Sequence, residues 1–145
     1  IRNKIYNIFS NKQVKFFTYV HSTAFVADSS RLGEGTIICP FSLVNDNVNL
    51  DKNCLVNVHC SIGHDSKLGR HSVLSPYVSI SGGCIVSEGL LAGSKSLLMP
   101  KIKVGKNCKI FPGTCVSTNV KCGTTVFSNT NPKMIPNFLK YDEKL

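Results

Sequence analysis

The 145-residue sequence predicts an all-β fold, a parallel β-helix built from hexapeptide repeats. Every sixth residue from Val26 to Cys122 is apolar, and the period continues through the whole stretch without a slip. The residue two places before each of these is small or apolar, as in the pairs Cys54–Val56 and Cys60–Ile62. The remaining positions carry mainly Gly, Asn, Asp, Lys and Pro, which suit bends.

This pattern has a direct geometric meaning. Residues two apart share one face of a strand, so the large aliphatic residue and its small partner both point inward. Three hexapeptides make one triangular coil of about eighteen residues, and the stretch holds roughly five to six coils. Coils stack as parallel strands about 4.8 Å apart. Each coil buries its apolar row on the next, so no repeat is expected to be stable alone.

The length and charge of the chain limit its domain count and the kinds of ligand or partner that it can bind. A chain of 145 residues favours one main domain. No apolar run approaches the roughly 18 residues that a membrane helix needs, so we expect no membrane partner. The net charge of +9 fits either a solvated lysine-rich surface or an anionic ligand such as a nucleotide or coenzyme A. Basic residues are neither clustered nor interleaved with aromatic residues, which argues against a nucleic-acid partner.

The seven cysteines are interpreted as core residues rather than disulfides or metal ligands. Cys54, Cys60, Cys84 and Cys108 occupy the small inward position of the repeat, and Cys122 occupies the large one. Buried thiols commonly fill such positions. Free cysteines in this number indicate a reducing, cytoplasmic location.

The flanks divide the chain into three parts. Residues 1–22 are interpreted as the last helix and strand of an α/β domain, residues 23–126 as the β-helix, and residues 127–145 as a C-terminal cap or tail. The predicted helix covers residues 1–12, with Ile1, Ile5, Ile8 and Phe9 on one face. The predicted strand covers residues 14–20. A turn at residues 131–133 and a short capping helix at residues 137–144 are expected near the end.

One polar cluster within the repeat could carry chemistry. His64 follows a Gly on a predicted bend and precedes Asp65, whose carboxylate can fix the tautomer of the imidazole. Gly82 stands one coil later, where its amide could stabilise an oxyanion. The spacing alone favours an ordinary surface histidine.

Two other interpretations stay open on the same prism. In the first, His59 and His64 have the spacing of two zinc ligands in a γ-carbonic-anhydrase-like site. Such a site needs a third ligand two coils before His59, but that position holds Thr23, and the nearby His21 lies two residues away from it. In the second, the β-helix is a non-catalytic scaffold, and neither His64 nor a zinc site carries out a reaction.

Two segments, VNVHCSIGHDSKLGRHSVLSPYVSISGG and GLLAGSKSLLMPKIKVGKNCKIFPGTCV, resemble the NeuD/PglD family of sugar acetyltransferases, in particular its PglD branch, the UDP-4-amino-sugar N-acetyltransferases. The resemblance implies a left-handed β-helix, whereas most parallel crossovers are right-handed. It also implies a cytoplasmic homotrimer with active sites between subunits. Residues 1–22 would then be the remnant of a Rossmann-like domain that holds the nucleotide sugar.

The resemblance also implies roles for particular residues. His64 matches the catalytic base, Asp65 its acidic neighbour and Gly82 the oxyanion donor. Asn57 matches an Asn near the reacting group, and two backbone positions that line the acetyl-CoA groove match Ser94 and Pro112. The position of a cofactor-contacting His is occupied here by Val73.

The implied activity is direct acetyl transfer from acetyl-CoA, the co-substrate, to the amine of a nucleotide-linked amino sugar in surface glycan biosynthesis. A sialic acid hydroxyl is the alternative acceptor. No acyl-cysteine intermediate is expected, because Cys60 points into the core, where a thiol stays protonated.

Overall fold

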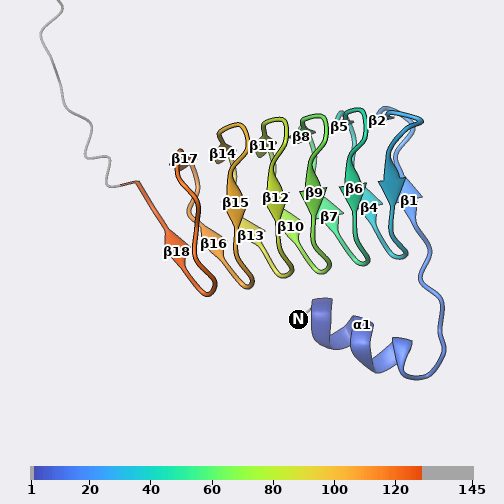
Figure 1. The fold of residues 1–145 in the computed structure, drawn as a ribbon. Coiled ribbons are helices and arrows are strands. Elements are labelled where there is room, and N and C mark those ends of the chain that lie inside the picture. Colours follow the sequence, from blue (N-terminus) through green and yellow to red (C-terminus); the bar gives the residue numbers. More distant parts are fainter. Residues whose placement is uncertain (1, 129–145) are drawn as a thin grey trace, which may run out of the picture.

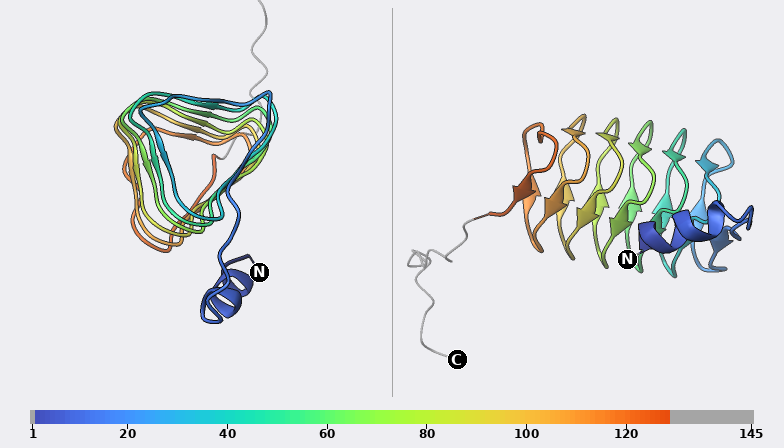
Figure 2. Two further views of the ribbon diagram at one scale, coloured as in Figure 1. Left: turned by 90° about the vertical axis from the view of Figure 1, so that its right-hand side faces the viewer. Right: turned by 90° about the horizontal axis from the view of Figure 1, so that it is seen from below.

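The computed structural model describes residues 2–128, which form a β-helix of about six turns and one short helix (Figure 1). Each coil contributes one two-residue strand to each of three parallel sheets, and the prism is triangular in cross-section (Figure 2). The predicted left-handed parallel β-helix is confirmed.

The strands form three sheets named A, B and C. Sheet A contains β1 (Tyr19–Val20), β4 (Ile37–Ile38), β7 (Leu55–Val56), β10 (Val73–Leu74), β13 (Leu91–Ala92), β16 (Lys109–Ile110) and β18 (Thr125–Val126). Sheet B contains β2 (Phe25–Val26), β5 (Leu43–Val44), β8 (Ser61–Ile62), β11 (Ser79–Ile80), β14 (Leu97–Leu98) and β17 (Cys115–Val116). Sheet C contains β3 (Arg31–Leu32), β6 (Asn49–Leu50), β9 (Lys67–Leu68), β12 (Ile85–Val86) and β15 (Lys103–Val104).

The core is a ladder of identical positions. The second residue of every strand from β4 to β17 is buried, and Leu74 pairs in register with Val56 and Ala92 on the neighbouring coils. The small inward residues are buried as well, and several of their hydroxyl and thiol groups donate to corner carbonyls, as Ser42 Oγ does to Asn57 O at 2.7 Å. Most of the buried hydroxyl groups thereby find a partner, whereas Ser96 Oγ has none among the described residues.

The three edges of the prism are turns with a left-handed residue every six positions. Asn47, Asn53, Asp65, Asn107 and glycines such as Gly83 have φ between 54° and 76°, as the turn pattern predicts. We name the edges by a residue on each. The His64 edge, between sheets B and C, comprises 45–47, 63–65, 81–83 and 99–101. The Asn57 edge, between sheets A and B, comprises 39–41, 57–59, 75–77, 93–95 and 111–113. The helix edge, between sheets C and A, comprises 33–35, 51–53, 69–71, 87–89 and 105–107.

The predicted period slips once, in the last coil. Strand register is eighteen residues elsewhere, but Lys109 pairs with Thr125 and Val104 forms a bridge with Val120. The corner after β17 is therefore two residues short. Val120 takes the place predicted for Cys122, and the prediction that Cys122 points inward is wrong, because its side chain is exposed. The four cysteines assigned to the small inward position are buried, as predicted.

The N-terminal segment is a helix, α1 (Arg2–Ser10), that lies outside the prism near the helix edge (Figure 2). Its packing residue is Tyr6, which is 7% exposed and stacks on Phe16 with ring centroids 4.5 Å apart. The predicted helix is confirmed over residues 2–10, and Ile5, Ile8 and Phe9 of its predicted apolar face are exposed rather than packed on the prism.

The predicted strand at residues 14–20 is mostly wrong. The structure gives strand only at Tyr19–Val20, and β1 pairs with β4, so the solenoid begins at Tyr19 rather than at residue 23. The assignment of residues 1–22 to a remnant of an α/β domain stays a prediction. The turn predicted at residues 131–133 and the cap helix predicted at 137–144 lie outside the described residues.

We expect the core ladder to dominate stability. Leu98→Ala removes a fully buried side chain, whereas Leu91→Ala removes the same atoms from a position that is 44% exposed. Cavity formation in a close-packed interior costs about 2–5 kcal/mol for Leu→Ala. Urea unfolding followed by circular dichroism should show a loss of that size for Leu98→Ala and a much smaller one for Leu91→Ala. Equal losses would contradict the assignment of inward and outward positions.

Thiol reactivity should follow burial. Burial raises the pKa of Cys54 to about 12 and that of Cys60 to about 11, so both stay protonated and inert in the native state. Exposed Cys115 and Cys122 should react with a thiol reagent at pH ~8, and all seven cysteines should react after denaturation without reductant. Fewer than seven thiols in the denatured sample would indicate disulfides and overturn the core assignment.

Candidate active site on the His64 edge

The His64 edge presents an imidazole at an exposed bend. β8 ends at Ile62, and Gly63, His64 and Asp65 make the turn into β9. Asp65 adopts the left-handed conformation with φ 58°, which Asp tolerates better than most residues. Its amide donates to Asp46 O at 3.0 Å on the previous coil. The turn thus projects the side chains of His64 and Asp65 into solvent.

The two side chains form a hydrogen-bonded pair. His64 Nδ1 lies 2.8 Å from Asp65 Oδ2, so the Asp at this position reaches the ring. A carboxylate can only accept, so Nδ1 carries the proton and the neutral ring keeps its lone pair on Nε2. Hydrogen bonds from His64 and then from Asn47 hold the pKa of the Asp65 carboxyl below its ordinary value. The arrangement orients an imidazole as a proton acceptor.

Asn47 was not identified from the sequence. Its Nδ2 donates to Asp65 Oδ1 at 3.3 Å, so both carboxylate oxygens of Asp65 are engaged. The sequence could have predicted this contact, because Asn47 stands eighteen residues before Asp65. At that spacing, coil stacking places the two residues side by side on one edge.

Gly82 lies directly against the His64 ring. A Cβ built on Gly82 would meet His64 Nε2 at 2.6 Å and Cε1 at 2.8 Å, so any larger residue would displace the imidazole. Nε2 therefore lies within about 6 Å of the Gly82 nitrogen, since N–Cα is ~1.5 Å. The coil below is equally tight, because a Cβ on Gly63 would meet Gly82 N at 2.5 Å.

Some backbone groups around this contact are hydrogen-bonded to neighbouring coils, and one amide is not. Gly83 N–H donates to His64 O at 2.8 Å, and Lys101 N–H donates to Gly82 O at 3.0 Å. Among the backbone hydrogen bonds of residues 2–128, the Gly82 N–H has no acceptor. A basic nitrogen and an uncommitted amide donor thus share one surface, which is the pairing that acyl transfer requires.

The other predicted site residues lie elsewhere. Asn57, Ser94 and Pro112 fall on the Asn57 edge, and sheet B separates this edge from His64 within one chain. The side chain of Asn57 caps its own turn, with Oδ1 accepting from Val58 N at 2.8 Å. Val73 points outward from sheet A and is half-buried. A single chain brings together only His64, Asp65 and Gly82.

His59 and Cys60 take no part in this geometry. The His59 ring is stacked between Phe41 and Tyr77, with centroids 5.1 and 4.8 Å away. Within residues 2–128, no three His, Cys, Asp or Glu side chains gather closely enough to hold a metal ion, so one chain does not assemble the zinc site that was considered. The Cys60 thiol is buried and donates to Ser75 O, and its raised pKa keeps it from acting as a nucleophile.

Comparison with known proteins gives weak sequence similarity and a clear fold similarity. No family model matches the chain. It is 26% identical over 164 residues to the bifunctional protein GlmU of Buchnera aphidicola, covering 97% of this chain and 34% of GlmU. It is 24% identical over 85 residues to the GDP-perosamine N-acetyltransferase of Escherichia coli O157:H7, covering 59% of this chain and 38% of that protein.

A solved structure matches the fold over most of the chain. PerB from Caulobacter crescentus, crystallised with CoA and GDP-perosamine, superimposes with a TM-score of 0.82 over 88% of this chain and 63% of PerB, at 20% identity. At that identity the likeness establishes the fold alone. The chain spans about a third of the length of the curated relatives it matches. No helix among the described residues is long and apolar enough to cross a membrane.

The His64–Asp65 pair can be tested without any substrate. Because the hydrogen bond from His64 is the main cause of the lowered pKa of Asp65, His64→Ala should raise that pKa toward the ordinary value near ~3.9. Asn47→Ala should raise it less. The stabilisation from a lowered carboxyl pKa is present above the unfolded value and is lost as pH falls through the folded value.

The measurement is a carbon-detected NMR titration of the Asp65 carboxyl in the two variants and in the parent protein. An unchanged Asp65 pKa in His64→Ala would show that the pair does not form in solution.

Proposed function

We propose that the chain carries the acetyltransferase part of an enzyme that moves an acetyl group from acetyl-CoA to the amine of a nucleotide-linked amino sugar. The observation that carries this proposal is the stacking of His64 Nε2 against Gly82, with Asp65 holding the opposite ring nitrogen. The names of the GDP-perosamine N-acetyltransferases to which the chain is similar support the class of acceptor and the thioester donor. The PglD branch, with a UDP-linked sugar, is the finer form of the proposal.

In the proposed reaction, the amine nitrogen attacks the thioester carbonyl of acetyl-CoA while His64 Nε2 removes its proton. The C–N bond forms, the C–S bond breaks, and the proton passes to the leaving thiolate of CoA. Asp65 keeps the ring in the tautomer that accepts at Nε2 and stabilises the imidazolium. General base catalysis of this kind contributes about 10² to 10⁴ in rate.

The Gly82 amide is proposed to donate to the oxygen of the tetrahedral intermediate. Its N–H is uncommitted among the described residues and adjoins the base. Removal of one oxyanion donor costs roughly 10²–10³ in rate in other enzymes. Gly82 is also required sterically, because a Cβ there would displace the His64 ring.

Acetyl-CoA is proposed to lie between two chains. Ser94 and Pro112, the positions proposed for the cofactor groove, lie on a different edge from His64. A second copy could present its Asn57 edge to the His64 edge of the first, which would unite the two sets in a homotrimer. Sheet A supports such packing, because its outward row includes Ile37, Leu55, Val73 and Leu91. Lys101, one coil beyond Gly83 on the His64 edge, supplies positive charge for a phosphate of the donor.

His64→Ala should lower acetyl transfer at least about a hundredfold, because it removes the base. The measurement is CoA release from acetyl-CoA with GDP-perosamine as acceptor, with the assembly state checked by light scattering. His21→Ala is the matched control, since His21 is a half-buried histidine whose ring hydrogen-bonds only to Thr23 among the described residues and does not lie on the His64 edge. Near-normal turnover in a folded His64→Ala variant would falsify the role of the base.

A further inference from the structure

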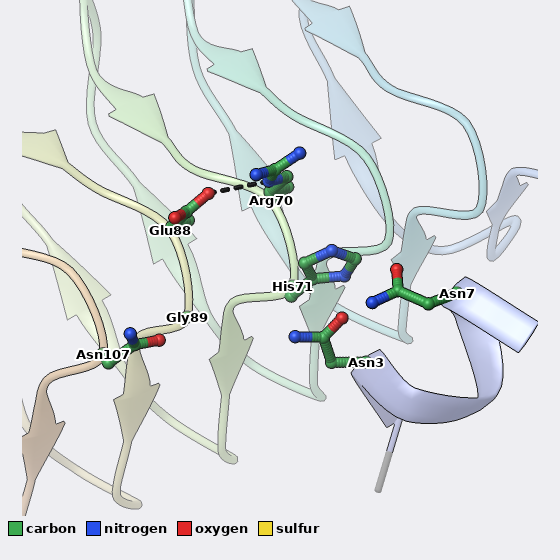
Figure 3. A pocket seen from close by; sticks show the side chains of 7 residues that line it. All are labelled: Asn3, Asn7, Arg70, His71, Glu88, Gly89 and Asn107. Atoms are coloured by element: carbon green, nitrogen blue, oxygen red, sulfur yellow. Dashed lines mark hydrogen bonds and ion pairs between the residues drawn. The ribbon is translucent and has the colours of Figure 1, made fainter.

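A polar cleft separates α1 from the helix edge, away from the His64 edge (Figure 3). It encloses about 230 Å³, which is the size of a small polar ligand rather than a whole coenzyme. Asn3 and Asn7 extend from α1 on one side, and residues 70–71, 88–89 and 107 form the other wall. Nearly all of its lining is polar.

The position of α1 over this cleft is fixed by packing. Tyr6 is buried between Phe16, stacked at 4.5 Å, and the edge of the His71 ring at 5.3 Å. Arg2 Nη2 donates to Asn53 Oδ1 at 2.8 Å, which ties the first turn of α1 to the same edge. Both contacts hold the helix at a spacing that leaves the cleft open.

The same contacts set the hydrogen-bonding state of His71. Asn53 uses its oxygen to accept from Arg2, so its Nδ2 donates to His71 Nδ1 at 2.9 Å. Burial, followed by the charge of Arg70, lowers the pKa of His71 and favours the neutral ring. The proton of that ring is therefore on Nε2, which remains as a donor at the cleft.

The cleft is lined by one cation, Arg70, and one anion, Glu88, and a second cation, Lys106, adjoins Glu88. Glu88 accepts from Arg70 Nε at 2.7 Å and pairs with Lys106 Nζ at 3.3 Å, so both its oxygens are committed to cations. These contacts with Arg70 and then Lys106 hold the pKa of Glu88 below its ordinary value. The two terminal guanidinium nitrogens of Arg70 have no partner among the described residues. Arg70 thus presents a free fork of donors, which suits a phosphate or a carboxylate.

Three amides complete the cleft. Asn3 and Asn7 are four residues apart and lie on one face of α1, and Asn107 stands across from them. Their side chains have no hydrogen-bond partner among residues 2–128. Gly89 keeps the floor open, because it has φ +76° and a Cβ there would collide with Asn107 Oδ1. Each amide offers a donor and an acceptor together, which matches a hydroxyl group.

We propose that this cleft binds a monosaccharide that carries one anionic group, a sugar phosphate or a sugar acid. The Arg70 fork and the His71 Nε2–H face the anion, and the amides of Asn3, Asn7 and Asn107 face the hydroxyls. An inorganic anion would leave the amide oxygens unpaired, and a neutral sugar would leave the terminal guanidinium nitrogens of Arg70 without an anionic acceptor. The site is separate from His64 and does not depend on the proposed acetyl transfer.

The test is isothermal calorimetry on the full chain with four probes: glucose 6-phosphate, glucuronate, glucose and inorganic phosphate. We expect glucose 6-phosphate or glucuronate to bind at one site per chain, and glucose and phosphate to bind at least about tenfold more weakly, because each lacks one set of partners. Comparison of the two anionic sugars identifies the anion that the cleft prefers.

Variants locate the binding. Asn3→Ala/Asn7→Ala should weaken it about tenfold, since two hydrogen bonds are lost and Ala favours the helix. Asn11→Ala, just beyond α1 and outside the cleft, should bind normally, and so should His64→Ala. The proposal is overturned if neither anionic sugar binds, if inorganic phosphate binds as tightly as they do, or if the double variant binds like the parent protein.

Discussion

The structure depends on parallel pairing of each coil with the next at a register of eighteen residues. That register places identical positions of the repeat above one another, so the inward residue of each strand stacks on those of the neighbouring coils, as Leu74 does on Val56 and Ala92. Because every strand is only two residues long, no coil has enough hydrogen bonds or apolar surface to persist alone. A single irregularity, the short corner after β17, therefore shifts everything after it by two residues and turns Cys122 outward.

The same stacking decides what the surface can do. At each edge the turn residues of successive coils lie over one another, which produces the Phe41–His59–Tyr77 ladder on one edge and the His64–Gly82 contact on another. The imidazole rings of His59 and His64 therefore have different surroundings. His59 is held between aromatic rings, whereas His64 faces a residue without a side chain and keeps a free Nε2.

The interior of the prism is filled, so ligands can bind only to its edges and faces. The His64 edge concentrates a base and an amide donor, and the helix edge holds a cleft that exists because Tyr6 docks α1 at a fixed distance. The Asn57 edge carries the remaining positions of the proposed acetyl-CoA groove, and one chain does not bring it to His64. Under the proposed function, these two sets of residues can form one site only when a second chain places its Asn57 edge against the His64 edge of the first.

The six-residue period by itself determined the β-helix, its inward residues and the turn positions, because coil stacking repeats a local pattern without alteration. It also singled out His64, Asp65 and Gly82, since residues eighteen apart must be neighbours on one edge. Only the tertiary structure decided the slip in the last coil, because Val120 and Cys122 are both apolar and fit either register. It also decided that Tyr6 rather than Ile5, Ile8 and Phe9 packs on the prism, since the docking surface of a short helix is set by the partner it meets. For the same reason the bond from Asn47 to Asp65 and the cleft beside α1 follow from contacts between coils and helix that no local pattern records.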